Sequence, residues 1–168
     1  MGGVIITGAM EAIPISVKAR LLLAGWRSNR DVWDELRLPV SLVVFSEAKR
    51  ILSRFGGLRF GNRNEHVVLD PVSAIEHDPD LLRRCEAAVG RPLYPLGYQE
   101  HQDREAILVD EDGAIYLNFG DDLHLLAMSF EASLRYLVHA GKSRDFHAAL
   151  CKARVPPRRW TVGDPASP

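Results

Sequence analysis

"EAILVDEDGAIYLNF", residues 105–119, indicates how the middle of this chain folds. The segments "EAILVD" and "AIYLNF" are short and apolar and alternate well enough to be two paired β-strands. The dipeptide Asp112-Gly113 between them favours the positive backbone angles of a tight turn. The stretch therefore predicts an antiparallel hairpin.

Further short strands are predicted on both sides of this hairpin. They are "LRFG" at 58–61, "HVVLD" at 66–70, a strand around "LYPLGYQEH" at 93–101, and "LHLLA" at 123–127. Helical spacing of apolar residues predicts helices over about 16–24, 41–55, 79–89, 130–140 and 143–155. Strands that cluster in the middle, flanked by helices, indicate an α+β fold with a mainly antiparallel sheet of about five to six strands.

Several of these helices carry residues that favour their ends. Side chains that can accept hydrogen bonds from the first turn are the predicted N-caps: Ser16, Asp78 and Ser129. Glycines just past the apolar stripes are the predicted stops: Gly25, Gly90 and Gly141. The dipeptide Asp70-Pro71 predicts a turn or a short helix.

The pair Gly56-Gly57 raises the question of a phosphate-binding loop. Such a loop follows a strand and opens a helix, so that helical N–H groups point at the anion. Here the order is helix, Gly-Gly, strand, and no Lys-Ser, Lys-Thr or GxGxxG pattern accompanies the pair. We therefore interpret it as a joint, with Gly57 left-handed in a Schellman stop, Leu58 packing back on Leu52, and Gly56 allowing a close backbone approach.

Length and composition narrow the class of protein. The 168 residues suit one domain, and no run approaches the roughly 18 apolar residues of a membrane span. The apolar N-terminal patch has no basic residue before it, unlike a secretory signal. Cys85 and Cys151 have no metal-ligand spacing, and we interpret both as buried apolar groups. We expect a cytoplasmic protein with no cofactor and no membrane contact.

A net charge of −1 hides an uneven charge distribution. Basic residues exceed acidic ones by five in residues 1–64 and by five in residues 132–168, whereas residues 65–131 carry 15 acidic and four basic residues. Such an acidic middle repels nucleic acid and favours a basic partner. The alternative interpretation is that sheet edges and loops need solubilising charge.

Motifs for catalysis and metal binding are incomplete. "SEAK" at 46–49 matches Ser-x-x-Lys without its partner motifs, and "DEDG" at 110–113 has its glycine too early for a calcium loop. His101, Asp103 and Glu105 lie on one face of a predicted strand and are the best candidates for a metal or hydrolytic site. Since no second cluster completes that site, an enzyme is the weaker alternative.

Six segments in order resemble the signature segments of the SUKH superfamily. They are "LLLAGW", "AKRILSRFGGLRF", "VVLDP", "AAVGRPLYPLGY", "ILVDEDGAIYL" and "DDLHLLAMSFEASLRYLVHAG". The resemblance spans about Ser16 to Gly141 and is closest to the group-three branch of bacterial immunity proteins. It divides the chain into an N-terminal extension (1–15), a SUKH-like domain (16–141), and a C-terminal helix with a loosely held basic tail (142–168).

The resemblance implies a non-enzymatic protein that neutralises a toxin of a polymorphic toxin system, commonly a nuclease or a nucleic-acid deaminase. Such a toxin needs a basic cleft to hold phosphates, so we expect an acidic face to occlude the cleft stoichiometrically, without direct nucleic-acid binding. The candidate contact residues are Glu100, Asp103, Glu105, Glu111, Asp112, Asp121 and Asp122. A binding or scaffold module with an endogenous protein partner is the alternative.

Overall fold

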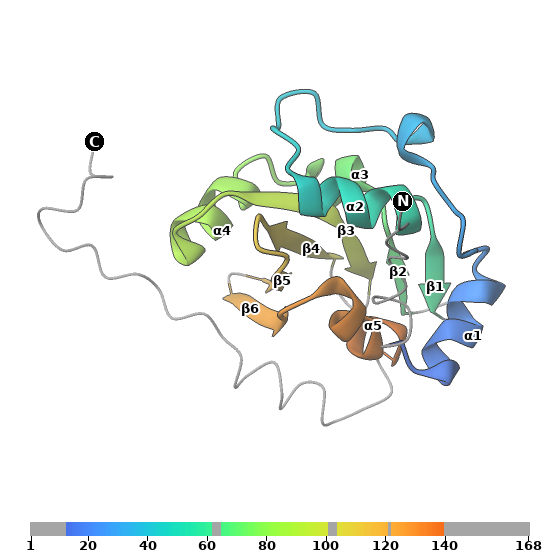
Figure 1. The fold of residues 1–168 in the computed structure, drawn as a ribbon. Coiled ribbons are helices and arrows are strands. Elements are labelled where there is room, and N and C mark those ends of the chain that lie inside the picture. The colour runs from blue at the N-terminus through green and yellow to red at the C-terminus, as the bar shows by residue number, and fades with distance from the viewer. Residues whose placement is uncertain (1–12, 62–64, 101–103, 121, 140–168) are drawn as a thin grey trace, which may run out of the picture.

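The computed structural model describes residues 13–61, 65–100, 104–120 and 122–139. Within them six strands form one sheet in the order β1-β2-β3-β4-β5-β6, with every neighbouring pair antiparallel (Figure 1). The strands are β1 (Arg59–Gly61), β2 (His66–Val68), β3 (Leu93–Glu100), β4 (Arg104–Asp110), β5 (Ile115–Phe119) and β6 (Asp122–Ala127). The predicted α+β class and antiparallel sheet are confirmed.

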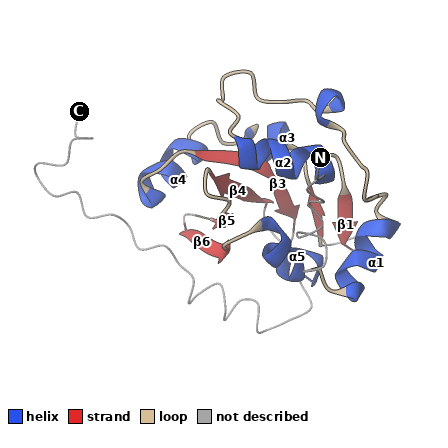
Figure 2. Cartoon of the chain, viewed as in Figure 1, coloured by secondary structure: helices blue, strands red, loops and turns tan. Residues whose placement is uncertain are grey.

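Helices cover both faces of this sheet (Figure 2). They are α1 (Ile15–Leu23), the 3-10 helix η1 (Trp33–Glu35), α2 (Ser46–Phe55), α3 (Pro71–Ile75), α4 (Leu81–Val89) and α5 (Phe130–His139). Side chains alternate along β4, so that Ile107 and Val109 join a large core with α1, α2 and α5. Leu108 points the other way, into a smaller core with α4. The sheet is therefore buried on both faces.

The joint between α2 and β1 has the predicted backbone but different hydrogen bonds. Gly57 has a φ of 73°, as predicted, and a Cβ at Gly56 would stand 2.6 Å from the Leu52 carbonyl oxygen. The Gly57 N–H donates to the Leu69 carbonyl at 2.7 Å. A Schellman stop requires the Leu58 N–H to donate to the Ser53 carbonyl, but here it donates to the Phe55 carbonyl. Since the Gly57 N–H is already bonded within the protein, the pair is a joint and not a phosphate loop.

Two helices begin later than predicted. α2 begins at Ser46 instead of residue 41, after an extended Phe45. α4 begins at Leu81, because Asp78 forms a turn before the helix. The Asp78 carbonyl accepts a hydrogen bond from the Leu81 N–H, and the Asp78 side chain accepts one from the Asp80 N–H, both at 3.2 Å. The predicted N-cap at Asp78 is therefore wrong.

The remaining helix ends divide between correct and incorrect predictions. α1 begins at Ile15 after Pro14, so the predicted cap Ser16 lies inside the helix. The Ser129 side chain accepts from the Ala132 N–H at 3.2 Å, as predicted, and Gly90 ends α4 in the left-handed conformation. Gly141 and the predicted helix over 143–155 lie outside the described residues. Across the ranges that are described, no helix has the length and apolar character needed to cross a membrane.

Candidate functional site

The candidate acidic residues lie at two opposite ends of the sheet. Turns between consecutive antiparallel strands alternate between the ends. Glu100 ends β3 and Asp122 begins β6, at one end; Glu111 and Asp112 form the β4–β5 turn at the other. We call residues 111–113 the hairpin tip. Because β4 has seven residues, the two ends are separated by roughly 20 Å, so these carboxylates form two groups.

One candidate is not on the surface. Glu105 is only 2% exposed, because it lies on the same face of β4 as Ile107 and Val109, which the helices cover. The expectation of an exposed carboxylate at Glu105 is therefore wrong. Glu100 is half-exposed, 3.5 Å from His66 Nε2, and Asp122 is partly buried. His101, Asp103 and Asp121 lie outside the described residues.

A buried carboxylate fixes the hairpin tip. Asp110 accepts hydrogen bonds from the backbone N–H groups of Asp112 at 3.0 Å and Ala114 at 2.9 Å. It also accepts from the Tyr116 hydroxyl and from Arg91 Nη1, each at 3.1 Å. Burial, together with the nearby Asp110 carboxylate, raises the pKa of Tyr116 to about 12. These bonds hold the tip in one shape.

The tip presents its own carboxylates to solvent. Glu111 is exposed and makes no hydrogen bond or ion pair with any residue that the structure describes. Asp112 is also exposed and pairs with Arg91 at 2.6 Å. Beside them is an open hollow of about 350 Å³, whose lining includes Arg91, Leu125 and the exposed Met128. The tip therefore offers anionic groups on a rigid support, next to apolar side chains.

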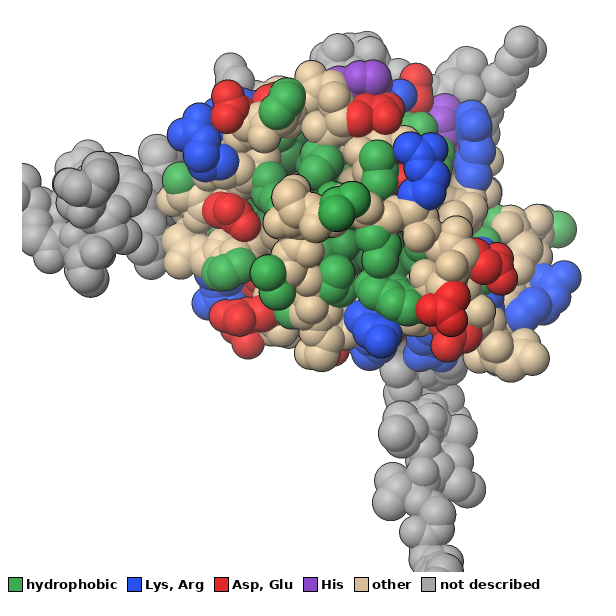
Figure 3. Space-filling view, turned by 90° about the horizontal axis from the view of Figure 1, so that it is seen from above, with side chains coloured by type: hydrophobic (Ala, Val, Ile, Leu, Met, Phe, Trp, Pro, Cys, Tyr) green, Lys and Arg blue, Asp and Glu red, His purple; other side chains and the backbone are tan. Residues whose placement is uncertain are grey.

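Residues 38–45, which we call the apolar loop, run along the top of Figure 1, the side from which Figure 3 is seen, and two of their apolar side chains are exposed. Val40 is fully exposed and Val43 is 88% exposed. Figure 3 shows hydrophobic side chains gathered at the middle of this face, with acidic and basic ones around them. The helix predicted over residues 41–55 includes Val43 and begins just after Val40, so neither valine was predicted to be exposed in a loop. A signal was present, since Val43 falls off the stripe formed by Phe45, Ala48 and Leu52.

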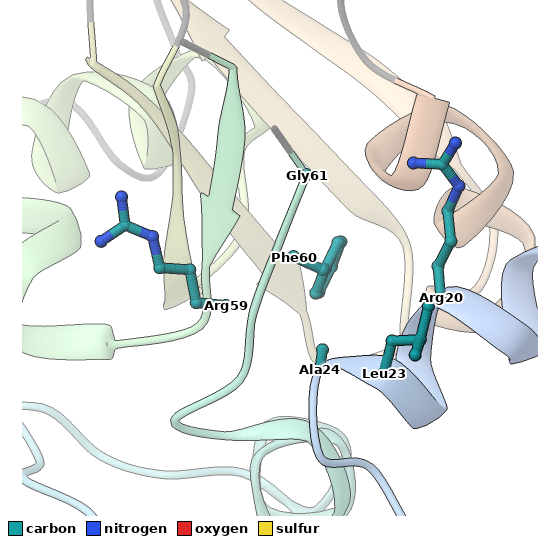
Figure 4. Close-up of a pocket in the computed structure, with 6 residues that line it drawn as sticks. All are labelled: Arg20, Leu23, Ala24, Arg59, Phe60 and Gly61. Atoms are coloured by element: carbon teal, nitrogen blue, oxygen red, sulfur yellow. The ribbon is translucent and has the colours of Figure 1, made fainter. Parts of the chain in front are cut away.

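The outer surface of α1 is a second exposed apolar site. Ile15 and Leu23 are 87% and 89% exposed, and Leu23 lines an open cavity of about 390 Å³ together with Arg20 and Arg59 (Figure 4). The two arginine side chains lie on either side of the β1 segment and do not converge. Alternation along β1 explains the direction of Arg59, because its neighbour Phe60 points into the large core and Arg59 therefore points to the opposite side of the strand. The cavity therefore does not form an anion site.

The described residues contain no group of three or more His, Cys, Asp or Glu that could hold a metal ion. Two of the three residues in the metal hypothesis, His101 and Asp103, fall outside those residues. Cys85 is buried, as predicted, and burial raises the pKa of its thiol to about 11. A thiol with so high a pKa is a poor nucleophile at neutral pH.

Comparison with known proteins gives one family. The family model described as SUKH-3 immunity protein matches residues 13–139. Neither the curated proteins nor the solved structures gave a match to this chain. The matched range begins two residues before α1 and ends with α5, so it includes all six strands and the five α-helices of the described part.

Proposed function

The chain belongs to the SUKH-3 immunity protein family, and from this premise we propose that it neutralises a cognate bacterial toxin by binding it and covering its active site. The observation that carries the proposal is that the family match spans the whole described fold, from residue 13 to residue 139. A buried Asp110 and its bonded neighbours support it, because they hold carboxylates in fixed positions at the surface. Inhibition by occlusion needs such a rigid surface and no reactive group.

The partner that suits these carboxylates is a toxin with a basic active-site cleft, such as a nuclease or a nucleic-acid deaminase. Enzymes of this kind neutralise phosphates with lysine and arginine, and acidic groups on an inhibitor are attracted to the same cleft. The candidate contact residues that remain are Glu100, Asp103, Glu111, Asp112, Asp121 and Asp122. Those that the structure describes lie at two ends of the sheet, so we expect the toxin to bind at one end only. Glu105 is left out because it is buried.

The test is to titrate the toxin domain encoded by the neighbouring gene with this protein and to measure the remaining toxin activity. An occluding protein that binds tightly gives a linear loss of activity that ends at one molar equivalent. A protein that inactivates the toxin catalytically removes the activity far below one equivalent, and this result would refute occlusion. Survival of cells that express both proteins, compared with cells that express the toxin alone, tests immunity itself.

A further inference from the structure

We propose that the toxin docks on the apolar loop and the hairpin tip together, with Val40 and Val43 as its main apolar contacts and the tip carboxylates as the charged rim. The inference rests on the proposed function and names the surface through which this protein binds the toxin. It selects one end of the sheet and excludes the end that carries Glu100 and Asp122.

The loop and the tip adjoin each other. Leu42, in the middle of the loop, packs against both cores, including the smaller one that contains Ala114 just after the tip. Glu47 follows the loop in the first turn of α2, and its Oε2 lies 3.3 Å from the place where a Cβ of Gly113 would stand. A partner that covers the loop therefore reaches the tip as well.

The exposed valines are held in place from below. A turn closes the loop, since the Leu42 N–H donates to the Pro39 carbonyl at 3.3 Å. Phe45 packs edge-on against the buried Tyr94, with ring centroids 6.0 Å apart. Two apolar side chains presented on a rigid loop suit the centre of a protein interface, where fully desolvated apolar contacts contribute most of the affinity.

Charge decides between this surface and the exposed apolar side chains of α1. Residues 31–50, which include the loop and the first turn of α2, carry four carboxylates and three basic residues. The tip adds Glu111 and Asp112 beside Arg91, which leaves this surface with a net charge of −2. α1 carries Lys18 and Arg20 and no acidic residue, and Arg59 lies near Leu23. A toxin with a basic cleft is attracted to the loop and the tip, and repelled by α1.

The experiment measures binding of the purified neighbouring toxin domain to three forms of the full chain. The first is the wild type, the second carries Val40→Ser and Val43→Ser, and the third carries the matched control pair Ile15→Ser and Leu23→Ser. We expect Kd to rise about 30-fold or more for the loop variant and less than about threefold for the control, because truncated interface anchors lose affinity and uninvolved surface residues do not. All four side chains are exposed, so melting temperatures should stay close to that of the wild type.

A second measurement does not depend on the loss of binding. The variant Ser41→p-benzoylphenylalanine should crosslink to the toxin on illumination, whereas Lys18→p-benzoylphenylalanine should not. If the wild type binds the toxin, but the loop variant binds equally well or crosslinking occurs only from position 18, the docking surface is wrong and the proposed function stands. If the wild type neither binds nor inhibits the toxin, the proposed function fails and this inference fails with it.

Discussion

Gly97 shows how a single residue sets the pairing of the sheet. It ends the register shift that begins at Pro95 in the pairing of β3 with β4, and the end of β2, which pairs with the other side of β3, lies close to it. A Cβ at this position would overlap the Val68 carbonyl oxygen and stand 2.7 Å from Leu69 Cα. Both obstacles are backbone atoms, which cannot move aside as a side chain can, so only glycine fits without displacing β2.

Replacement of Gly97 is therefore expected to be costly. Gly97→Ala should lower the free energy of unfolding by about 3 kcal/mol, the upper part of the usual range for single substitutions. Gly120→Ala is the control, since Gly120 has a φ of 58° and open space around its Cβ position; it should cost about 1 kcal/mol from backbone strain alone. Urea denaturation of both variants gives the comparison. Equal losses would mean that close packing against β2 is unimportant.

Tyr116 makes stability depend on pH in the alkaline range. Its folded-state pKa is about 12, above the usual value near 10, so the folded protein holds this proton more tightly than the unfolded chain. The stabilisation is complete below pH 10 and is lost as pH rises from 10 toward 12. Cys85, with a pKa of about 11, causes a similar loss between about pH 9 and 11.

Tyr116→Phe should separate these two contributions. The variant keeps the loss that comes from Cys85, but its free energy of unfolding should fall less steeply above pH 10 than that of the wild type. Near pH 8 it should be about 1 kcal/mol less stable, because the hydrogen bond to Asp110 is gone. Urea titrations between pH 8 and 11.5 provide the data. Parallel curves above pH 10 would show that ionisation of Tyr116 does not act on folding.

The strands and the start of α5 were predictable from the sequence, whereas the starts of α2 and α4 were not. Alternation and the Asp112-Gly113 turn are local signals, and the observed β4 and β5 follow them. The start of α2 depends on tertiary contacts, because Leu42 and Phe45 pack against the core from the loop before the helix rather than from within it. The burial of Glu105 also depends on which sheet face the helices cover, and alternation within one strand cannot reveal that.

An ion pair between helices distant in sequence is a further feature that no local pattern shows. Arg50 of α2 bonds Glu131 of α5 at 2.7 Å and Glu47 at 3.0 Å. The Glu131 side chain is largely buried. Removal of the arginine therefore leaves a carboxylate with little access to water, which costs more than the loss of an exposed pair.

Arg50→Met should accordingly destabilise the protein by about 2 kcal/mol, since it keeps most of the aliphatic stem but removes the partner of Glu131. The matched control is Arg83→Met, which breaks the exposed pair between Arg83 in α4 and Asp80 just before that helix and should cost less than about 0.5 kcal/mol. Thermal and urea unfolding of both variants give the difference. A similar small cost for both would show that the α2–α5 pair is as weak as a surface pair.

Over the whole molecule, the candidate carboxylates that the structure describes are divided between two opposite ends of one sheet, roughly 20 Å apart, so the charge at each end can be changed separately. Long-range attraction acts mainly on the association rate, and it weakens as the screening length falls from about 30 Å in 10 mM salt to about 3 Å in 1 M salt. Charge reversal at each end in turn therefore reports which end approaches the toxin first. Glu111 suits this purpose because, among the described residues, it has no ion pair to lose.

Glu111→Lys should slow association with the toxin roughly fivefold in 10 mM salt and hardly at all in 1 M salt, because only the long-range attraction changes. Asp122→Lys, at the opposite end, carries the same change of charge and should slow association less. Stopped-flow measurements across salt concentrations give both rates. A larger effect from Asp122→Lys would place the encounter at the other end of the sheet. Salt-independent association rates for both variants would mean that carboxylates do not guide the approach and that the apolar loop acts alone.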